Sequence, residues 1–368
     1  MPGLPVAAVE GGGMVADPQG ADRPQARRRR GRTAVLLACA VLAGGLAVLP
    51  HPAITVPWVV VPLQSLVPVL CLVAVALAMV MAVARQRWAA LVLVAGAVAG
   101  LVPALVPMAP PAASVAPDDA AGAGASGGAG SPQAPAELTL LSLNAEYAGV
   151  DPAALASVIR ENGVDVLVLV EADEKLLDGL QARGALDGLP HRTAAIPEEP
   201  QGGKAGGAVI LSAHPLRSEG VLPRFAGYRH FDQPVAVVQD PGLGAVRVVG
   251  IHPVPPIGPD FVPSWDQTLR GLAGWQAERS DLPLVLAGDF NASGAHPQFR
   301  TLAEGFIPAA AAAGPWPGAT WPVGSWVPPF TQIDHVLLRG LVPQDYRRLT
   351  LPGTDHRGIL TTVTAGGI

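Results

Sequence analysis

The chain has 368 residues, of which 50% are hydrophobic and 14% are charged, and its formal net charge is −5. This composition is too apolar for an ordinary soluble protein, and the acidic balance argues against a protein that tracks duplex DNA through a basic face. Both cysteines, Cys39 and Cys71, lie in apolar stretches, so the remainder of the chain can form neither a disulfide nor a cysteine metal site.

Residues 1–32 are predicted to form a disordered, basic N-terminus. They are rich in Gly, Pro and Ala, and they end in a cluster of arginines between Arg27 and Arg32.

Residues 33–108 are predicted to form a membrane anchor of three helices. No Asp, Glu, Lys or Arg occurs from residue 33 to residue 84, which leaves room for two spans of roughly 20 residues each. A third apolar stretch follows from Trp88. The arginines before the first span and at Arg85 and Arg87 predict a cytoplasmic N-terminus and an extracellular C-terminal domain. A cleaved signal peptide would account for the first apolar stretch only.

Residues 109–136, rich in Pro, Ala, Gly and Ser, are predicted to be a flexible linker, and residues 137–368 a single α/β domain. Asp151-Pro152 predicts a helix start, because Asp caps helices and Pro suits the first helical position. Apolar runs and periodicity predict helices over 151–162, 174–183, 264–280 and 297–304, and strands over 138–143, 165–170, 208–211, 235–239, 246–251, 284–287, 333–338 and 359–363. This order favours two packed sheets with helices outside.

Polar residues follow or precede six of these predicted strands. They comprise two amides, four carboxylates and two imidazoles: Asn144, Glu171, His252, Asp289, Asn291, Asp334, Asp355 and His356. Each could by itself be a turn residue or a helix cap, but six such coincidences in one domain are improbable. Oxygen ligands select Mg²⁺ or Mn²⁺, and histidine titrates near neutral pH. The set therefore predicts a metal site beside an acid/base pair.

The order of these motifs resembles the endonuclease/exonuclease/phosphatase family, which has the DNase-I-like fold. The matching motifs are Leu-Asn, Val-Glu, Ile-His, Gly-Asp-Phe-Asn, Ile-Asp-His and Thr-Asp-His-Arg, and they extend over about residues 137–363. Thr354 replaces the family's usual Ser and keeps the hydroxyl. The resemblance implies an α/β fold, a two-layered β-sandwich flanked by helices, here preceded by three transmembrane helices.

The resemblance also implies the metal ligands. Glu171, with Asn144 and Asp355, would hold Mg²⁺ or Mn²⁺.

The remaining residues would be catalytic by the same resemblance. His356, oriented by Asp334, would act on the phosphate as base or electrostatic stabiliser. Asp289 would orient or activate the attacking water, and Asn291 would bind a phosphate oxygen. His252 would stabilise the transition state or protonate the leaving oxygen.

The predicted function is that of a membrane-anchored phosphohydrolase acting outside the cytoplasmic membrane. The architecture resembles bacterial membrane phosphohydrolases of the teicoplanin-resistance (VanJ) type. From residue 137 onward we count 24 acidic and 16 basic residues. This balance favours a lipid bilayer and a small or lipid-linked phosphate as partners over nucleic acid. Alternatives are an exported nuclease or broad-specificity phosphodiesterase, and a non-catalytic membrane-bound binding module.

Three tryptophans lie in one Pro/Gly-rich stretch before the strand at 333–338. Trp321 is expected to pack in the core, whereas Trp316 and Trp326 are candidates for contact with lipid head groups, because Trp is enriched at membrane interfaces.

Overall fold

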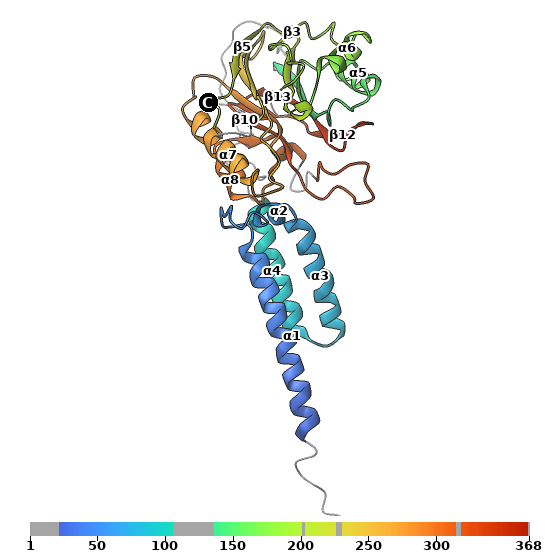
Figure 1. Cartoon of the computed structure of the whole chain (residues 1–368), viewed down its shortest axis with the longest axis vertical. Coiled ribbons are helices and arrows are strands. Elements are labelled where there is room, and N and C mark those ends of the chain that lie inside the picture. The colour runs from blue at the N-terminus through green and yellow to red at the C-terminus, as the bar shows by residue number, and fades with distance from the viewer. Residues whose placement is uncertain (1–21, 106–135, 201–202, 226–229, 314–317, 367–368) are drawn as a thin grey trace, which may run out of the picture.

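The computed structural model describes residues 22–105, 136–200, 203–225, 230–313 and 318–366 (Figure 1). Most of the predicted disordered N-terminus and nearly all of the predicted linker, residues 109–136, lie outside the described residues, as does Trp316. In the described part, a globular domain sits on the end of a helical bundle.

The bundle contains α1 (Asp22–Val48), α3 (Val67–Val83) and α4 (Arg87–Leu105), with the short helix α2 (Val60–Ser65) at the end nearest the globular domain. Because α1 begins at Asp22, the basic segment that ends at Arg32 is helical, and the prediction of disorder up to residue 32 is wrong there. Both α1 and α3 pack against α4.

Two of these helices are long and apolar enough to cross a membrane, over Arg27–Val48 and Arg87–Ala104. The third apolar helix, α3, has 17 residues and is shorter than that length. Signal sequences and core helices of soluble proteins can have the same length and composition as the two longer helices. Two candidate spans are therefore found where the sequence predicted three.

The globular domain consists of two sheets. In the seven-stranded sheet the order is β11 (Leu341–Pro343), β13 (Arg357–Ala365), β1 (Glu137–Asn144), β2 (Val166–Val170), β4 (Ala208–Ser212) and β3 (His191–Arg192), with β12 (Arg347–Thr350) also on β13. In the six-stranded sheet the order is β5 (Leu216–Val221), β6 (Pro234–Asp240), β7 (Gly244–Ile251), β8 (Leu284–Asp289), β10 (Asp334–Arg339) and β9 (Ile307–Pro308). The pairs β1–β2 and β7–β8 are parallel, and the other pairs are antiparallel.

The sheets pack face to face, and helices cover their outer faces. Along β2 every side chain is buried: Val166 and Val168 face the second sheet, whereas Leu167 and Leu169 face α5 (Pro152–Glu161) and α6 (Glu174–Gln181). Two-sided burial explains why β2 is a continuous apolar run. On the outer face of the second sheet lie α7 (Val262–Ala277) and α8 (Pro297–Ala303), and short 3₁₀ helices occur at Gly203–Gly206 and Ala309–Ala313.

The predicted strands and helices of this domain are all present, with ends shifted by a few residues. The pattern missed β5 and β12, edge strands whose side chains are mostly exposed, and the very short strands β3, β9 and β11. Exposed edge strands lack the alternating apolar signal on which such predictions depend.

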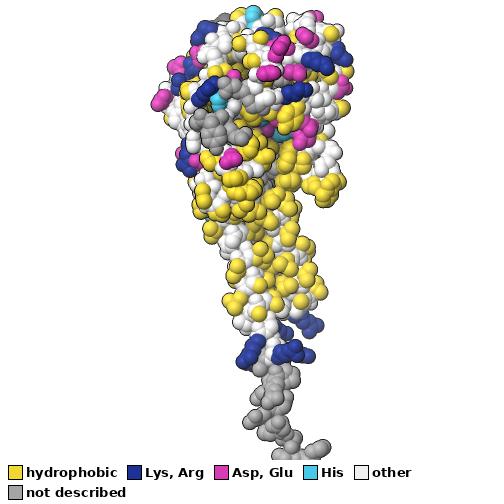
Figure 2. All heavy atoms as spheres, in the orientation of Figure 1, with side chains coloured by type: hydrophobic (Ala, Val, Ile, Leu, Met, Phe, Trp, Pro, Cys, Tyr) yellow, Lys and Arg dark blue, Asp and Glu magenta, His cyan; other side chains and the backbone are white. Residues whose placement is uncertain are grey.

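Side-chain types are distributed unevenly along the molecule (Figure 2). Hydrophobic side chains cover the bundle and the adjoining part of the globular domain, whereas basic side chains gather at the free end of the bundle. The charged side chains of both signs lie mainly on the globular domain.

Candidate active site

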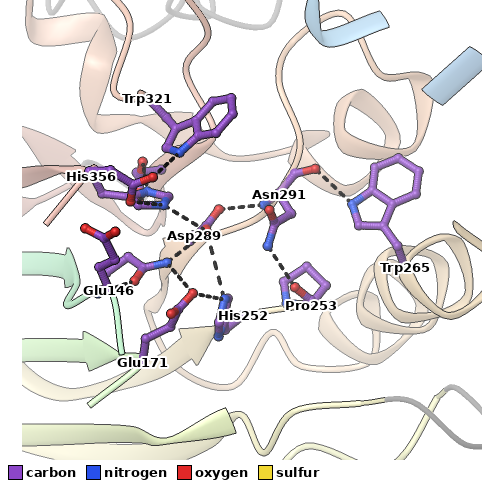
Figure 3. A network of polar contacts seen from close by, with 12 residues as sticks. Glu146, Glu171, His252, Pro253, Trp265, Asp289, Asn291, Trp321 and His356 are labelled. Atoms are coloured by element: carbon purple, nitrogen blue, oxygen red, sulfur yellow. Dashed lines mark hydrogen bonds and ion pairs between the residues drawn. The ribbon is translucent and has the colours of Figure 1, made fainter. Parts of the chain in front are cut away.

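The ends of several strands meet at one edge of the packed sheets (Figure 3). Because β1 and β2 are parallel, as are β7 and β8, each strand of a pair ends at the same edge as its partner, which places Asn144 beside Glu171 and His252 beside Asp289. Strand β10 runs antiparallel to β8 with Asp334 opposite Asp289, so the start of β10 lies at that edge too.

The segment before β13 completes the edge through Thr354. Its hydroxyl donates to the carbonyl of Asn144 at 2.8 Å and accepts from the backbone N–H of His356 at 3.1 Å. These two bonds need a hydroxyl group and hold the neighbouring Asp355 and His356 over the end of β1. The Thr found in place of the family's Ser can make both.

An amide links two carboxylates at the centre of the edge. The Nδ2 of Asn144 donates to Glu171 Oε1 at 3.0 Å and to Asp289 Oδ2 at 3.1 Å. Its Oδ1 accepts from the backbone N–H of Glu146 at 2.9 Å, and the N–H of Tyr147 donates to Glu171 Oε2 at 3.1 Å. In this arrangement Asn144 is a donor to both acids, so its predicted role as a metal ligand requires the amide to turn over.

His356 is held by one carboxylate and faces two others. Its Nδ1 lies 3.0 and 3.1 Å from the two oxygens of Asp334, and its Nε2 lies 3.8 Å from Asp289 Oδ2 and 3.6 Å from Asp355 Oδ1. Burial by itself lowers the pKa of His356, but Asp334 and Asp289 outweigh it and raise that pKa to about 10. The imidazole is therefore a cation at neutral pH.

His252 is the opposite case. Its Nε2 lies 3.5 Å from Glu171 Oε1 and 3.9 Å from Asp289 Oδ2, and its ring packs against Phe231. Burial, together with the nearby cation of His356, lowers the pKa of His252 to about 3. The two histidines are thus held in different charge states by their surroundings.

Asn291 is fixed from three sides. Its backbone N–H donates to Asp289 Oδ1 at 2.7 Å, its Nδ2 donates to the carbonyl of Pro253 at 3.0 Å, and its own carbonyl accepts from the indole of Trp265 at 3.1 Å. These bonds hold Asn291 in a left-handed conformation with φ of 47°. One amide hydrogen of its side chain remains for a ligand.

Backbone strain is concentrated at this edge. Glu171, with φ of 54°, and the consecutive residues Glu146, Tyr147 and Ala148 also lie in the left-handed region. Non-glycine residues seldom adopt this conformation, and where they do it is often at sites that bind or react.

The charge balance of the site favours a bound cation. Burial raises the pKa of Asp289 and that of Glu171. Repulsion by the negative charge of Asp355 raises the pKa of Glu171 further. Oxygens of Asp289 and Asp334 and a nitrogen of His356 lie within 4.8 Å of one another. Closely spaced carboxylates that are hard to ionise are relieved by a hard cation, so the carboxylate oxygens of the site fit Mg²⁺ or Mn²⁺, whereas the imidazolium of His356 has no lone pair to offer.

Five of the eight site residues line a pocket of about 880 Å³. One part of its wall is polar and contains Glu171, Asp289, Asn291, Asp355 and His356. The rest of the lining is largely apolar, and it includes Pro62, Ser65 and Leu66 of the helical bundle and Val254, Ile257 and Phe261 of the globular domain.

The structure brings all eight predicted site residues together, but sequence reasoning missed several neighbours. Glu146 lines the pocket, and Trp265 supports Asn291 from α7. Trp321 does not pack in the core as predicted, because it is only partly buried, lines the pocket and donates to Asp355 Oδ2 at 2.9 Å. A hydrogen bond to a distant carboxylate leaves no local sequence signal.

Residues 141–356 match the Endonuclease/Exonuclease/phosphatase family over more than half of the chain. The chain belongs to this family. Members of the endonuclease/exonuclease/phosphatase family are hydrolases that act on phosphate esters. No curated protein matches the chain.

The chain is similar to several solved structures. Humanized D. rerio TDP2 with 14 mutations is 17% identical, and the match covers 62% of this chain and 99% of that one, with a TM-score of 0.50. An endonuclease/exonuclease/phosphatase from Beutenbergia cavernae is 21% identical over 63% of this chain and 72% of its own, with a TM-score of 0.49. D. rerio TDP2 complexed with single strand DNA product is 16% identical over 62% and 99%, also with a TM-score of 0.49. The predicted DNase-I-like fold of two sheets with flanking helices is confirmed.

Proposed function

We propose that this family member is a membrane-anchored phosphohydrolase that depends on Mg²⁺ or Mn²⁺ and acts outside the cytoplasmic membrane. Its substrate would be a lipid-linked or other envelope phosphate ester or anhydride. One observation carries the proposal: the carboxylates and His356 of the polar edge line a pocket whose other lining is largely apolar and includes residues of the helical bundle. A hydrolytic site of this composition suits a substrate with a charged head and an apolar chain.

The metal would be held by Glu171 and Asp355, with Asn144 after its amide turns over. When bound, the cation would neutralise negative charge on the phosphate and on the leaving oxygen.

His356 and Asp334 would form an electrostatic pair directed at the phosphate. Asp334 fixes the ring through Nδ1, and the raised pKa keeps the imidazolium charged, so the free Nε2 can donate to a phosphate oxygen. In a buried His–Asp pair, the carboxylate both orients the imidazole ring and stabilises its positive charge.

Asp289 would accept the proton of the attacking water. Its raised pKa brings it nearer to neutral pH than an ordinary carboxylate, which improves a general base. The Asn291 amide would donate to a phosphate oxygen. His252, neutral and next to Glu171, would donate its Nε2 hydrogen to an oxygen of the transition state.

The membrane topology is proposed from the arginines. Arginines cluster in the first turns of α1, Arg85 lies between α3 and α4, and Arg87 begins α4, so both groups are at the free end of the bundle. Positive residues are retained on the cytoplasmic side, which favours an extracellular catalytic domain over residues 137–368 joined by the 109–136 linker. A third span would then consist of α3, and the architecture would be of the teicoplanin-resistance type.

Exposed apolar side chains support a site that works at a lipid surface. Trp326 is 94% exposed and Ile257, at the pocket, is 67% exposed. Large apolar side chains at a membrane–water boundary are stable in contact with lipid head groups.

Substrate comparison tests the proposal. The full chain in phosphatidylcholine nanodiscs with Mg²⁺ should release phosphate from a polyprenyl pyrophosphate more efficiently than it nicks plasmid DNA. Glu171→Gln is the matched inactive control. Equal or better cleavage of DNA would support the nuclease alternative, and no metal-dependent hydrolysis of either substrate would support the binding module.

A further inference from the structure

A short segment of the helical bundle forms part of the catalytic pocket. Pro62 and Ser65 of α2, and Leu66 after it, line the same cavity as Glu171 and His356. In the sequence this segment is separated from the catalytic domain by a whole helical hairpin and the linker. Its presence in the pocket means that the bundle contributes to the site as well as tethering it.

A buried histidine fixes this segment to the catalytic domain. The backbone N–H of Ser293 donates to His296 Nδ1 at 2.9 Å, so the ring hydrogen is on Nε2, which donates to the carbonyl of Val61 at 3.0 Å. The same Nε2 lies 3.4 Å from the hydroxyl of Ser65. Val61 is fully buried among the side chains of α7.

Further contacts flank this histidine. Arg300 donates to the carbonyl of Pro50 at 2.6 Å, and Gln64 donates to the carbonyls of Leu49 and Pro52. Gly294 lies so close to the end of α4 that an added Cβ would be 2.2 Å from the carbonyl oxygen of Ala104. Such close approach and direct hydrogen bonds are features of a packed interface rather than of a loose tether.

Other apolar residues line the same pocket. Val254, Ile257 and Phe261 come from the loop between β7 and α7, and together with Pro62 and Leu66 they give the pocket an apolar part beside its carboxylates. Val59, which directly precedes α2, and Leu63, within α2, are exposed at the end of the bundle. Figure 2 shows hydrophobic side chains that extend from the bundle onto the adjoining part of the globular domain.

We infer that the α2 segment is the specificity-determining wall of the active site, and that Pro62 and Leu66 hold the apolar chain of a lipid phosphate while its head group reaches Glu171 and His356. The inference rests on the proposed hydrolytic function. The α2 segment would distinguish a lipid phosphate from a soluble one, because its apolar side chains can contact the apolar chain of a lipid and have no counterpart in a soluble phosphate.

Chain-length selectivity measures the effect of this wall. The full chain in nanodiscs is assayed on a long-chain and a short-chain alkyl phosphate with the same head group. Leu66→Ser should lower the ratio of kcat/KM for the long-chain to the short-chain ester by about tenfold, the usual effect of one apolar pocket contact. Leu63→Ser, at an exposed position of α2 outside the pocket lining, should leave both values unchanged.

Photolabelling provides a readout that needs no hydrolysis. A long-chain phosphonate with a diazirine near its head group is irradiated with the wild-type chain, and the labelled peptides are identified by mass spectrometry. Label is expected on the peptide that contains residues 62–66 and on the one that contains 254–261, and excess unlabelled phosphonate should remove it.

The outcomes separate the two proposals. Labelling of residues 62–66 without hydrolysis of any phosphate would refute the proposed function and support the wall. Hydrolysis with an unchanged selectivity ratio in Leu66→Ser and no label on residues 62–66 would refute the wall and leave the function standing. Equal loss on both esters in Leu66→Ser, with no label on the segment, would show that Leu66 only stabilises the fold.

Discussion

Replacing Gly288 with alanine should separate the two strands that carry His252 and Asp289. Gly288 pairs with Ile251 in the parallel β7–β8 ladder, directly before Asp289. Its φ is +148°, and a Cβ built on it would lie 2.0 Å from the carbonyl oxygen of Ile251. The obstacle is backbone, which cannot rotate away as a side chain can. Steric contact with the neighbouring strand therefore explains why the Gly-Asp-Phe-Asn motif has glycine at this position.

The magnitude follows from this geometry. Ordinary contact begins near 3.4 Å, so the two strands must move apart by about 1.4 Å. Overpacking costs about 1–3 kcal/mol, and holding a non-glycine residue at such a φ costs about 1–3 kcal/mol more. We expect the free energy of unfolding to fall by roughly 2–6 kcal/mol, which corresponds to a Tm lower by roughly 5–20 °C. A displacement of about 1 Å at the reacting groups should lower kcat by about 100-fold.

The assay is thermal unfolding of the full chain in detergent, followed by tryptophan fluorescence, together with phosphate release. Gly274→Ala is the matched control, because an added Cβ at this position in α7 meets no atom within 4 Å. That change should raise stability by about 0.5–1 kcal/mol and leave activity unchanged. If Gly288→Ala melted within 2 °C or so of the wild type and kept its activity, the steric reasoning would be refuted.

Three further outcomes are expected from the proposed site. Chelation by EDTA should abolish phosphate release, Mg²⁺ or Mn²⁺ should restore it in the wild type but not in Glu171→Gln, and full activity after exhaustive chelation would exclude the metal. Asp334→Asn removes a carboxylate that raises the pKa of His356, so the alkaline limb of the pH–activity profile should move to lower pH by roughly one to three units; an unmoved limb would show that another group titrates there. A C-terminal alkaline phosphatase fusion should be active and a C-terminal cytoplasmic fluorescent reporter dark, and the reverse pattern would place the catalytic domain inside the cell.

Much of the globular domain follows from local sequence. The Asp151-Pro152 pair predicts the start of α5, and the Asp151 carboxylate does accept from the N–H of Ala153 at 2.9 Å. The run from Val166 to Val170 predicts a strand buried on both faces, as found. These features depend on neighbours a few residues apart, because caps and periodic burial are local consequences of side-chain type.

The residues of the candidate site could also be identified from the sequence, because they lie at the ends of predicted strands. The chain direction at each strand end follows from the fold, and parallel pairs bring such ends together. Their charge states could not be predicted. The imidazoles of His252 and His356 differ because one lies in an apolar environment and the other between carboxylates, and burial and distance exist only after folding.

Only the tertiary structure decided what surrounds the site. Trp265 supports Asn291, Trp321 binds Asp355, and His296 joins the catalytic domain to α2 through contacts between residues far apart in the chain. A single indole or imidazole has no pattern that names its distant partner. The sequence by itself determined the strands, the caps and the chemical groups of the candidate site, because these depend on local geometry. The pocket between bundle and catalytic domain was decided by packing, because it depends on which distant surfaces meet.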